Sequence, residues 1–225
     1  MEVDNCIRSR RSIRDYRNVP VKLSDIAHIL DSAVYAPSSG NIQNWRFVVV
    51  SNKELKYNIS KACFDQDWMN TAPVFIVICN DGEVVERMYG NPGKKYSLIN
   101  CVAVAQNILL KAHSIGLASC WICAFDQDLI GQFLGIPKKV IPESIITLGY
   151  SNVKKPVVPK RHDIHEYTFF NNYGNTKMDS SHFLKAQEIK ESKKEEIVEK
   201  EEEKTGKLKK FVSKFIEKDE SGFLP

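Results

Sequence analysis

A loop rich in hydrogen-bonding side chains lies between two apolar segments near the start of the chain. In "APSSGNIQNW", residues 36–45, five amides and hydroxyls fall within seven residues: Ser38, Ser39, Asn41, Gln43 and Asn44. A simple connector needs fewer such groups, since its composition is set mainly by turn geometry. We therefore expect a polar, planar ligand to lie against this loop.

Basic side chains are concentrated in a second segment, near the N-terminus. A guanidinium is a charged planar fork that matches phosphate oxygens, and a hydroxyl can complete such a cradle. Lys160 and Arg161 form another basic pair, placed to reach the same phosphate from far along the chain. The alternative is a solvated basic surface without a ligand. In "RSRRSIRDYR" the arginines that surround Ser12 are Arg8, Arg10, Arg11, Arg14 and Arg17.

Two further patterns are compatible with a redox or a metal site, and the sequence favours neither. Cys120 and Cys123 form a C-x-x-C, but they fall in a segment predicted as a buried strand, where only evenly spaced side chains share a face. A reactive dithiol places its first cysteine at a helix N-terminus instead. His162 and His165 have no cysteine or acidic partner at the spacing of a zinc site, so we predict no metal.

The charge distribution limits the classes of partner. The net charge of the 225 residues is +4, and residues 180–225 hold 11 Lys and 11 Asp or Glu, so the excess belongs to residues 1–179. That excess suits a small anionic ligand and is too small to indicate nucleic acid. The longest apolar run, "VFIVIC", is far shorter than the ~18 residues of a membrane helix. With no secretory signal pattern at the N-terminus, we expect a cytoplasmic protein.

Alternating helices and strands must position these groups. Apolar periodicity predicts helices over 24–36, 53–63, 95–115 and 127–135, with Ser24 and Asp126 as N-caps, and strands over 46–51, 73–80, 119–124 and 144–151. This order predicts an α/β or α+β sandwich. Helix 95–115 is apolar on nearly every side, so it is either central to the domain or shared with a partner subunit.

The chain is predicted to form one domain, residues 1–179, followed by a charged extension over 180–225. After Ser151 the sequence becomes extended and rich in proline. Within the extension, "KLKKFVSKFIEK" places apolar residues on one face of a helix and lysines on the other. Such a tail could act as a non-enzymatic binding element for an acidic membrane or a partner, although packing on its own dimer is the simpler expectation.

Several segments occur in a fixed order between about residues 7 and 174. They are "RRSIRDY", "YAPSSGNIQNWRFVVV", "NCVAVAQNILLKAHSIGLASCWICAF", "LGIP", "ITLGY" and a Lys-Arg pair before "NNYG". In this order and spacing the chain resembles the FMN-dependent nitroreductase family. The resemblance implies an α+β fold, an α-β-α sandwich around a mostly antiparallel sheet, in an intertwined homodimer with one FMN per active site at the interface.

The resemblance also assigns residues to the flavin. Arg10, Arg11 and Ser12 correspond to the grip on its phosphate and ribityl chain, which Lys160 and Arg161 would join. Arg14 corresponds to the cation at the pyrimidine edge, where reduced flavin carries negative charge. Gln66 corresponds to a residue that reaches the same edge in some members.

The polar loop and one strand end complete the implied site. Pro37, Ser38, Ser39, Asn41 and Gln43 correspond to the loop that lies against the partner's flavin. The family usually has proline where this chain has Asn44, so we expect a different stiffness in the loop. At the strand end, Ile122, Cys123 and Ala124 correspond to the backbone beside flavin N5.

The implied reaction is an exchange at one site. NADH or NADPH would reduce FMN, leave, and be replaced by a small electron-poor acceptor such as a nitroaromatic or a quinone. This chemistry resides in the cofactor, so it needs no acid–base triad. The family also contains dehalogenating and flavin-fragmenting enzymes, and the short segment "DGEVVERMYGNPGKKY" between two core elements favours an open pocket.

Overall fold

The computed structural model describes residues 1–177 of the chain. The helices of this part are α1 (Val3–Ser9), α2 (Leu23–Ala33), α3 (Lys53–Ala62), α4 (Glu83–Tyr89), α5 (Gly93–Ser114) and α6 (Gln127–Leu134). Short 3-10 turns lie at η1 (Ser39–Asn41), η2 (Asp67–Thr71) and η3 (Ile164–Glu166). The strands are β1 (Trp45–Val50), β2 (Val74–Asn80), β3 (Ala118–Ile122) and β4 (Ile141–Gly149).

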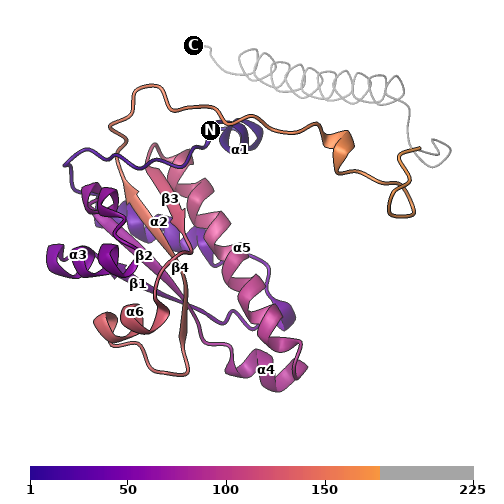
Figure 1. Cartoon of the computed structure of the whole chain (residues 1–225), viewed down its shortest axis with the longest axis horizontal. Helices are drawn as coiled ribbons and strands as arrows, with labels where there is room; N and C mark the ends of the chain where they lie inside the picture. Colours follow the sequence, from indigo (N-terminus) through magenta and orange to yellow (C-terminus); the bar gives the residue numbers. More distant parts are fainter. Residues whose placement is uncertain (178–225) are drawn as a thin grey trace, which may run out of the picture. The chain divides into compact units, whose positions relative to one another are not determined.

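The strands form one sheet in the order β1-β2-β4-β3, and each neighbouring pair is antiparallel. β1 and β3 therefore form opposite edges (Figure 1). The register places Trp45 opposite Asn80, and Asn80 opposite Ile141, at one end of the sheet. The other end holds Ala118 opposite Gly149. The predicted α+β class is confirmed.

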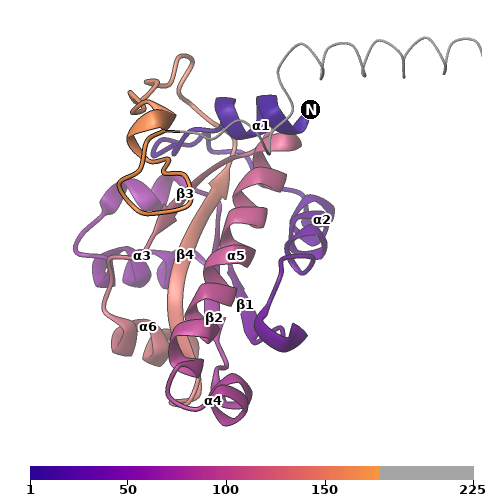
Figure 2. The ribbon, with the colours of Figure 1, turned by 90° about the vertical axis from the view of Figure 1, so that its right-hand side faces the viewer.

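Helices cover both faces of the sheet. Figure 2 shows α2 and α5 on one side, and α3 and α6 on the other. Along β2, alternate residues enter the two cores, so that Ile76 packs with α5 and Val77 with α3 and α6. Every residue of β2 is buried for this reason, as its uninterrupted apolar run predicts.

The arginine-rich segment runs along the free edge of β3. Ser12 forms a parallel bridge with Ser119, and the backbone N–H of Ile13 donates to the Ser119 carbonyl at 3.0 Å. Tyr16 anchors the segment, because its buried hydroxyl donates to the Ile13 carbonyl at 2.6 Å and lies 2.7 Å from the Thr147 hydroxyl. Residues 10–14 are thereby fixed beside β3.

Local chemistry corrects several element boundaries. Asp126 caps α6 as predicted, accepting from the Leu129 N–H at 3.0 Å. Ser24 is not an N-cap, because α2 starts at Leu23 and its cap position is Lys22. The segment 83–89, predicted to be part of a short connection, is the helix α4. Its seven residues are too few for the periodicity to stand out.

The structure decides one prediction about burial and corrects another: of the two alternatives for helix 95–115, a fully central position is wrong, and a face shared with a partner stays a prediction. Helix α5 is buried along one face only, and on the other face Leu98, Ile99 and Val102 remain 42–49% exposed. Strand β3 ends at Ile122, so Cys123 lies outside the buried strand and is exposed. The other five cysteines are buried and free.

The chain divides into two compact units, Met1–Pro159 and Lys160–Pro225. Residues 178–225 lie outside the described part, so the predicted boundary at 179/180 and the amphipathic extension stay predictions. None of the helices within residues 1–177 has the length and apolarity needed to cross a membrane.

Candidate functional site

Three predicted cofactor residues lie around one buried thiol on β3. The hydroxyl of Ser12 is close enough to Cys120 to hydrogen-bond to its thiolate form, and the charges of Arg14 and Arg10 also act on this sulfur. Burial raises the pKa of the Cys120 thiol, and these three groups oppose the increase. The segment and the strand therefore form one electropositive edge, in which Cys120 stays a neutral core thiol.

The predicted pyrimidine-edge residues meet through an aromatic ring that the sequence analysis did not single out. The guanidinium carbon of Arg14 lies 5.7 Å from the centroid of Trp68. The Trp68 Nε1–H donates to Gln66 Oε1 at 3.2 Å, and Gln66 Nε2 donates to the Cys63 carbonyl at 3.0 Å. The tryptophan two residues after Gln66 was the available signal, since a cation is attracted to an indole face.

The guanidinium groups of this edge have no acidic partners in the part of the chain that the structure describes. Within residues 1–177, no carboxylate lies within 4 Å of Arg10, Arg11 or Arg14, whereas Arg8 pairs with Asp4 at 2.8 Å. Arg11 Nη1 donates only to backbone carbonyls, at 2.6 Å and 2.7 Å. Cations collected without counter-charges fit an anionic ligand such as a phosphate.

The exit of β3, three residues beyond the Ser119 bridge to the arginine segment, is open to solvent. Ile122 is buried at the last position of the strand, and Cys123 and Ala124 follow it as exposed residues outside the ladder. Desolvation, and after it the Glu143 carboxylate, raise the pKa of the Cys123 thiol. The backbone at 123–124 is thus accessible to a ring approaching from outside.

The polar loop, residues 37–43, is held in shape by its own side chains and by α5. The Ser38 hydroxyl accepts from the Gln43 N–H at 3.2 Å, and Gln43 Nε2 donates to Asn41 Oδ1 at 3.0 Å. Both Asn41 and Gln43 have positive φ, 56° and 53°, a conformation that the dense hydrogen bonding sustains. Asn100 Oδ1 accepts from the Ser39 N–H at 3.0 Å.

Asn44 belongs to the interior, and its amide is not available to a ligand. Its Nδ2 donates to Asn80 Oδ1 at 2.7 Å and to the Ser97 carbonyl at 3.1 Å, and its Oδ1 accepts from Asn100 Nδ2 at 2.7 Å. The expectation that all five polar side chains face a ligand is therefore wrong for Asn44. This side chain anchors the loop through hydrogen bonds, at the position where the family usually has proline.

The two groups of predicted residues lie at opposite corners of the sheet. The loop leads into Trp45 at the start of edge strand β1, at the end of the sheet that holds Asn80 and Ile141. The arginine segment bridges Ser119 on the other edge strand, next to the Ala118–Gly149 end. One chain alone does not bring the loop to the arginines.

The remaining predicted residues belong to the second unit of the chain. Lys160 and Arg161 belong to the second unit, so their contact with a shared phosphate stays a prediction. His162 Nδ1 lies 3.0 Å from Glu166 Oε2, and both side chains are exposed. Among the described residues, no group of three or more His, Cys, Asp or Glu is placed to hold a metal ion.

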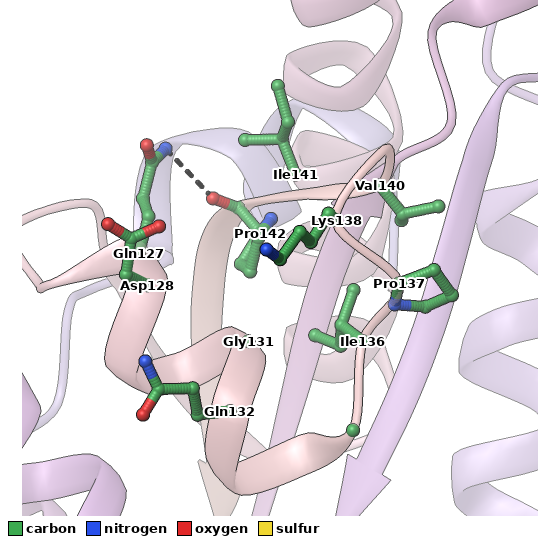
Figure 3. Close-up of a pocket in the computed structure, with 11 residues that line it drawn as sticks. Gln127, Asp128, Gly131, Gln132, Ile136, Pro137, Lys138, Val140, Ile141 and Pro142 are labelled. Carbon is green, nitrogen blue, oxygen red and sulfur yellow. Dashed lines mark hydrogen bonds between the residues drawn. The ribbon is translucent and has the colours of Figure 1, made fainter.

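A hollow of about 770 Å³ lies between α6 and the connection to β4 (Figure 3). Gln127 closes one side of it, where Nε2 donates to the Pro142 carbonyl at 3.0 Å. Lys138 and Asp128 are its only charged lining residues, and none of the predicted cofactor residues lines it. It is therefore a different feature from the arginine edge, the name used below for Arg10, Arg11, Ser12 and Arg14 beside β3.

The sequence of the chain matches a family of known proteins. Residues 7–66 and 63–150 match the sequence model of the "Nitroreductase family". The chain is 32% identical over 190 residues to a Bacillus subtilis protein named "FMN reductase [NAD(P)H]", covering 76% of this chain and 75% of the relative.

Solved structures give the same result. An "FMN-dependent Nitroreductase" from Clostridium difficile is 30% identical with a TM-score of 0.66, covering 76% of this chain and 99% of the other. A "nitroreductase family protein" from Clostridium novyi is 27% identical with a TM-score of 0.63, covering 80% and 99%.

Proposed function

The chain belongs to the nitroreductase family, and on that premise we propose that it is an FMN-dependent oxidoreductase that uses NADH or NADPH. Relatives whose names specify FMN and NAD(P)H support the cofactor and the reductant. The acceptor is a small electron-poor molecule, such as a nitroaromatic or a quinone. Reductant and acceptor occupy the same site in turn.

The observation that carries the proposal is that, within residues 1–177, the arginine edge has no acidic partner and is bridged to β3, the strand whose end is open to solvent. Arg10, Arg11 and Ser12 bind the phosphate and ribityl chain of FMN, since these cations have no carboxylate partners in the described structure. Arg14, held over Trp68, faces the pyrimidine edge together with Gln66. When bound, FMN supplies a ring that takes up a hydride and passes the electrons on.

The backbone of the β3 exit has a positioning role. Ile122 is fixed in the ladder, and this fixes the direction in which Cys123 and Ala124 leave the sheet. Their backbone would lie alongside the reactive edge of a bound flavin ring. Arg14 stabilises negative charge on the ring electrostatically, and its contact with Trp68 fixes its orientation before the ligand arrives.

We further propose that the active site is completed by a second copy of the chain. The loop 37–43 and the arginine edge lie at opposite corners of the sheet, so two copies related by a twofold axis can bring the loop of each to the arginines of the other. The exposed apolar face of α5, with Leu98, Ile99 and Val102, supplies area for such contact.

The decisive experiment is to purify the protein without added cofactor and to identify any flavin released on denaturation. We expect a yellow protein with about one FMN per chain, a dimeric mass in solution, and parallel lines in steady-state kinetics with NAD(P)H and a quinone. A colourless protein that also takes up no added FMN would remove the oxidoreductase proposal.

A further inference from the structure

A second basic site lies away from the residues proposed to hold the flavin. A hollow of about 290 Å³ is formed by the N-terminal half of α3 and the connection between η2 and β2. None of its lining residues belongs to the arginine edge, to the β3 exit or to the loop 37–43. The lining residues that matter are Asn18, Lys53, Lys56, Tyr57, Asn70 and Thr71.

Lys56 is the unusual member of this group. Its side chain is carried into the protein by α3, and the residue is only 7% exposed. The ammonium donates to the Ala72 carbonyl at 2.6 Å and lies 5.8 Å from the centroid of the Phe75 ring. An ammonium has three protons to donate, and the described residues accept one of them.

Within residues 1–177, the charge of Lys56 has no counter-charge nearby. In the described part of the chain no carboxylate lies within 4 Å of its Nζ or of Lys53 Nζ. Lys61, on the same helix, shows the ordinary arrangement, with Asp65 at 3.0 Å and Asp67 at 3.1 Å. A buried charge is costly unless it is paired, so an anion bound at this position would stabilise the cation.

Lys53 reinforces the imbalance. Burial and the charge of Lys53 both lower the pKa of Lys56, which means that the two ammonium groups are close enough to repel each other. Asn70 and Tyr57 line the same hollow, and Asn70 Nδ2 donates to the Ser60 hydroxyl at 2.9 Å, which leaves its second amide proton for a ligand. A bound oxyanion would offset the repulsion between the ammonium groups of Lys53 and Lys56.

We propose that this hollow is a binding site for a phosphate-type oxyanion, either free phosphate or the phosphate of a small monoester. Lys56 and Lys53 supply the charge, and Asn70 and Tyr57 supply hydrogen bonds. The site does not depend on the proposed flavin chemistry.

The hollow also touches the turn that positions Trp68. Thr71, one of its lining residues, donates to the Trp68 carbonyl at 2.8 Å and accepts from the Tyr16 N–H at 3.2 Å. An anion held here would therefore stiffen η2, the turn that places Trp68 under Arg14.

The test is a titration of the full-length protein, saturated with FMN, with sodium phosphate at constant ionic strength maintained with sodium chloride. Binding to the folded state raises the unfolding temperature with ligand concentration. We expect this rise in the wild type, and an at least tenfold weaker phosphate affinity in Lys53→Gln and Lys56→Met. The matched control is Lys61→Gln, which removes a paired lysine from the same helix and should leave the response unchanged.

Titrations with two ligands identify the kind of phosphate that binds, and the variants test whether the site exists. A parallel titration with glycerol phosphate that binds more tightly than inorganic phosphate assigns the site to a monoester, and the reverse order assigns it to free phosphate. Since Lys53 is exposed, Lys53→Gln is expected to fold even where Lys56→Met does not. An unchanged response in Lys53→Gln, or no response in the wild type, would overturn the proposal. A protein that fails to bind FMN is titrated as purified, so the two proposals fail separately.

Discussion

The arginine edge and the polar loop use polar residues in opposite ways. Along β3, Arg10, Arg11 and Arg14 have no acidic partner in the described structure, and their segment is fixed by its backbone and by Tyr16. In the loop, the side chain of Asn44 makes three short hydrogen bonds and is almost completely buried. Within residues 1–177, the guanidinium groups of the arginine edge therefore have no counter-charge, whereas the Asn44 amide is fully hydrogen-bonded inside the protein.

This difference separates binding from support. Buried polar groups are normally hydrogen-bonded, so the complete pairing of Asn44, Asn80 and Asn100 indicates a structural anchor. Unpaired cations on a rigid strand edge indicate a site that awaits an anion. The loop contributes to the proposed site through Ser38, Ser39 and Asn41, which the anchor holds in place.

The largest expected effect is on FMN affinity and comes from a change in the arginine edge. Replacing Arg14 by Ala removes a charge-assisted contact to the flavin, so FMN affinity should fall by roughly 10- to 100-fold, as for other hydrogen bonds to charged groups. Fluorescence quenching of FMN measures this. Arg17→Ala, which removes a nearby exposed arginine, is the control and should bind FMN as the wild type does. Equal losses in both variants would mean that only net charge matters.

The next effect tests the anchor. Replacing Asn44 by Ala leaves Asn80 and Asn100 with unsatisfied buried groups, which costs about 1–3 kcal/mol of folding stability for each group. Urea unfolding should show a lower midpoint with an unchanged slope. Gln43→Ala, which removes an exposed amide next to it in the loop, should change the midpoint little. If both variants behaved alike, the inward network would not be an anchor.

A third experiment tests whether the two regions meet between chains. Arg14→Ala impairs the arginine edge, and the double variant Ser39→Ala/Asn41→Gly impairs the loop, with glycine tolerating the positive φ at position 41. Unfolding and refolding the two together forms mixed dimers, in which one of the two sites is intact. We expect recovery of about a quarter of wild-type FMN reduction. Activity equal to the average of the two separate variants would place each site within one chain.

The sequence predicted the fold better than the site. The apolar run of β2, the alternation of elements and the Asp126 cap are local signals, and each is confirmed. The inward turn of Asn44 is not local, because it depends on Asn80 and on Ser97 and Asn100 of α5. Composition placed this amide correctly in a polar loop but could not show which side of the loop it faces.

Dependence on residues distant in sequence also explains why the role of Trp68 and the exposure of Cys123 were not predicted. Trp68 acquires its role only when η2 packs beside the arginine segment, 54 positions earlier in the chain at Arg14. Cys123 was assigned to a buried strand because "SCWICA" is apolar, yet the ladder with β4 ends at Ile122 paired with Ile145. Where a strand ends depends on its neighbour, and a run of apolar letters does not carry that information.

The smallest expected effect concerns Cys120 on β3 and Cys123, which directly follows the end of the strand. Cys123 is exposed and Cys120 is buried, so iodoacetamide should modify Cys123 and spare Cys120 in the folded protein. Because the thiolate is the reactive form and the pKa of Cys123 is raised, the rate should still be climbing with pH above ~8.5, the midpoint of an ordinary thiol.

Bound FMN should protect Cys123 if the β3 exit faces the ring. Mass spectrometry after labelling with and without FMN measures this, with Cys123→Ser as the control that removes the labelled site. We expect the serine variant to keep its FMN affinity within about twofold, because the exit contributes its backbone and not its thiol. Equal labelling with and without FMN would move the ring away from the exit of β3, while leaving the arginine edge as the phosphate-binding part of the site.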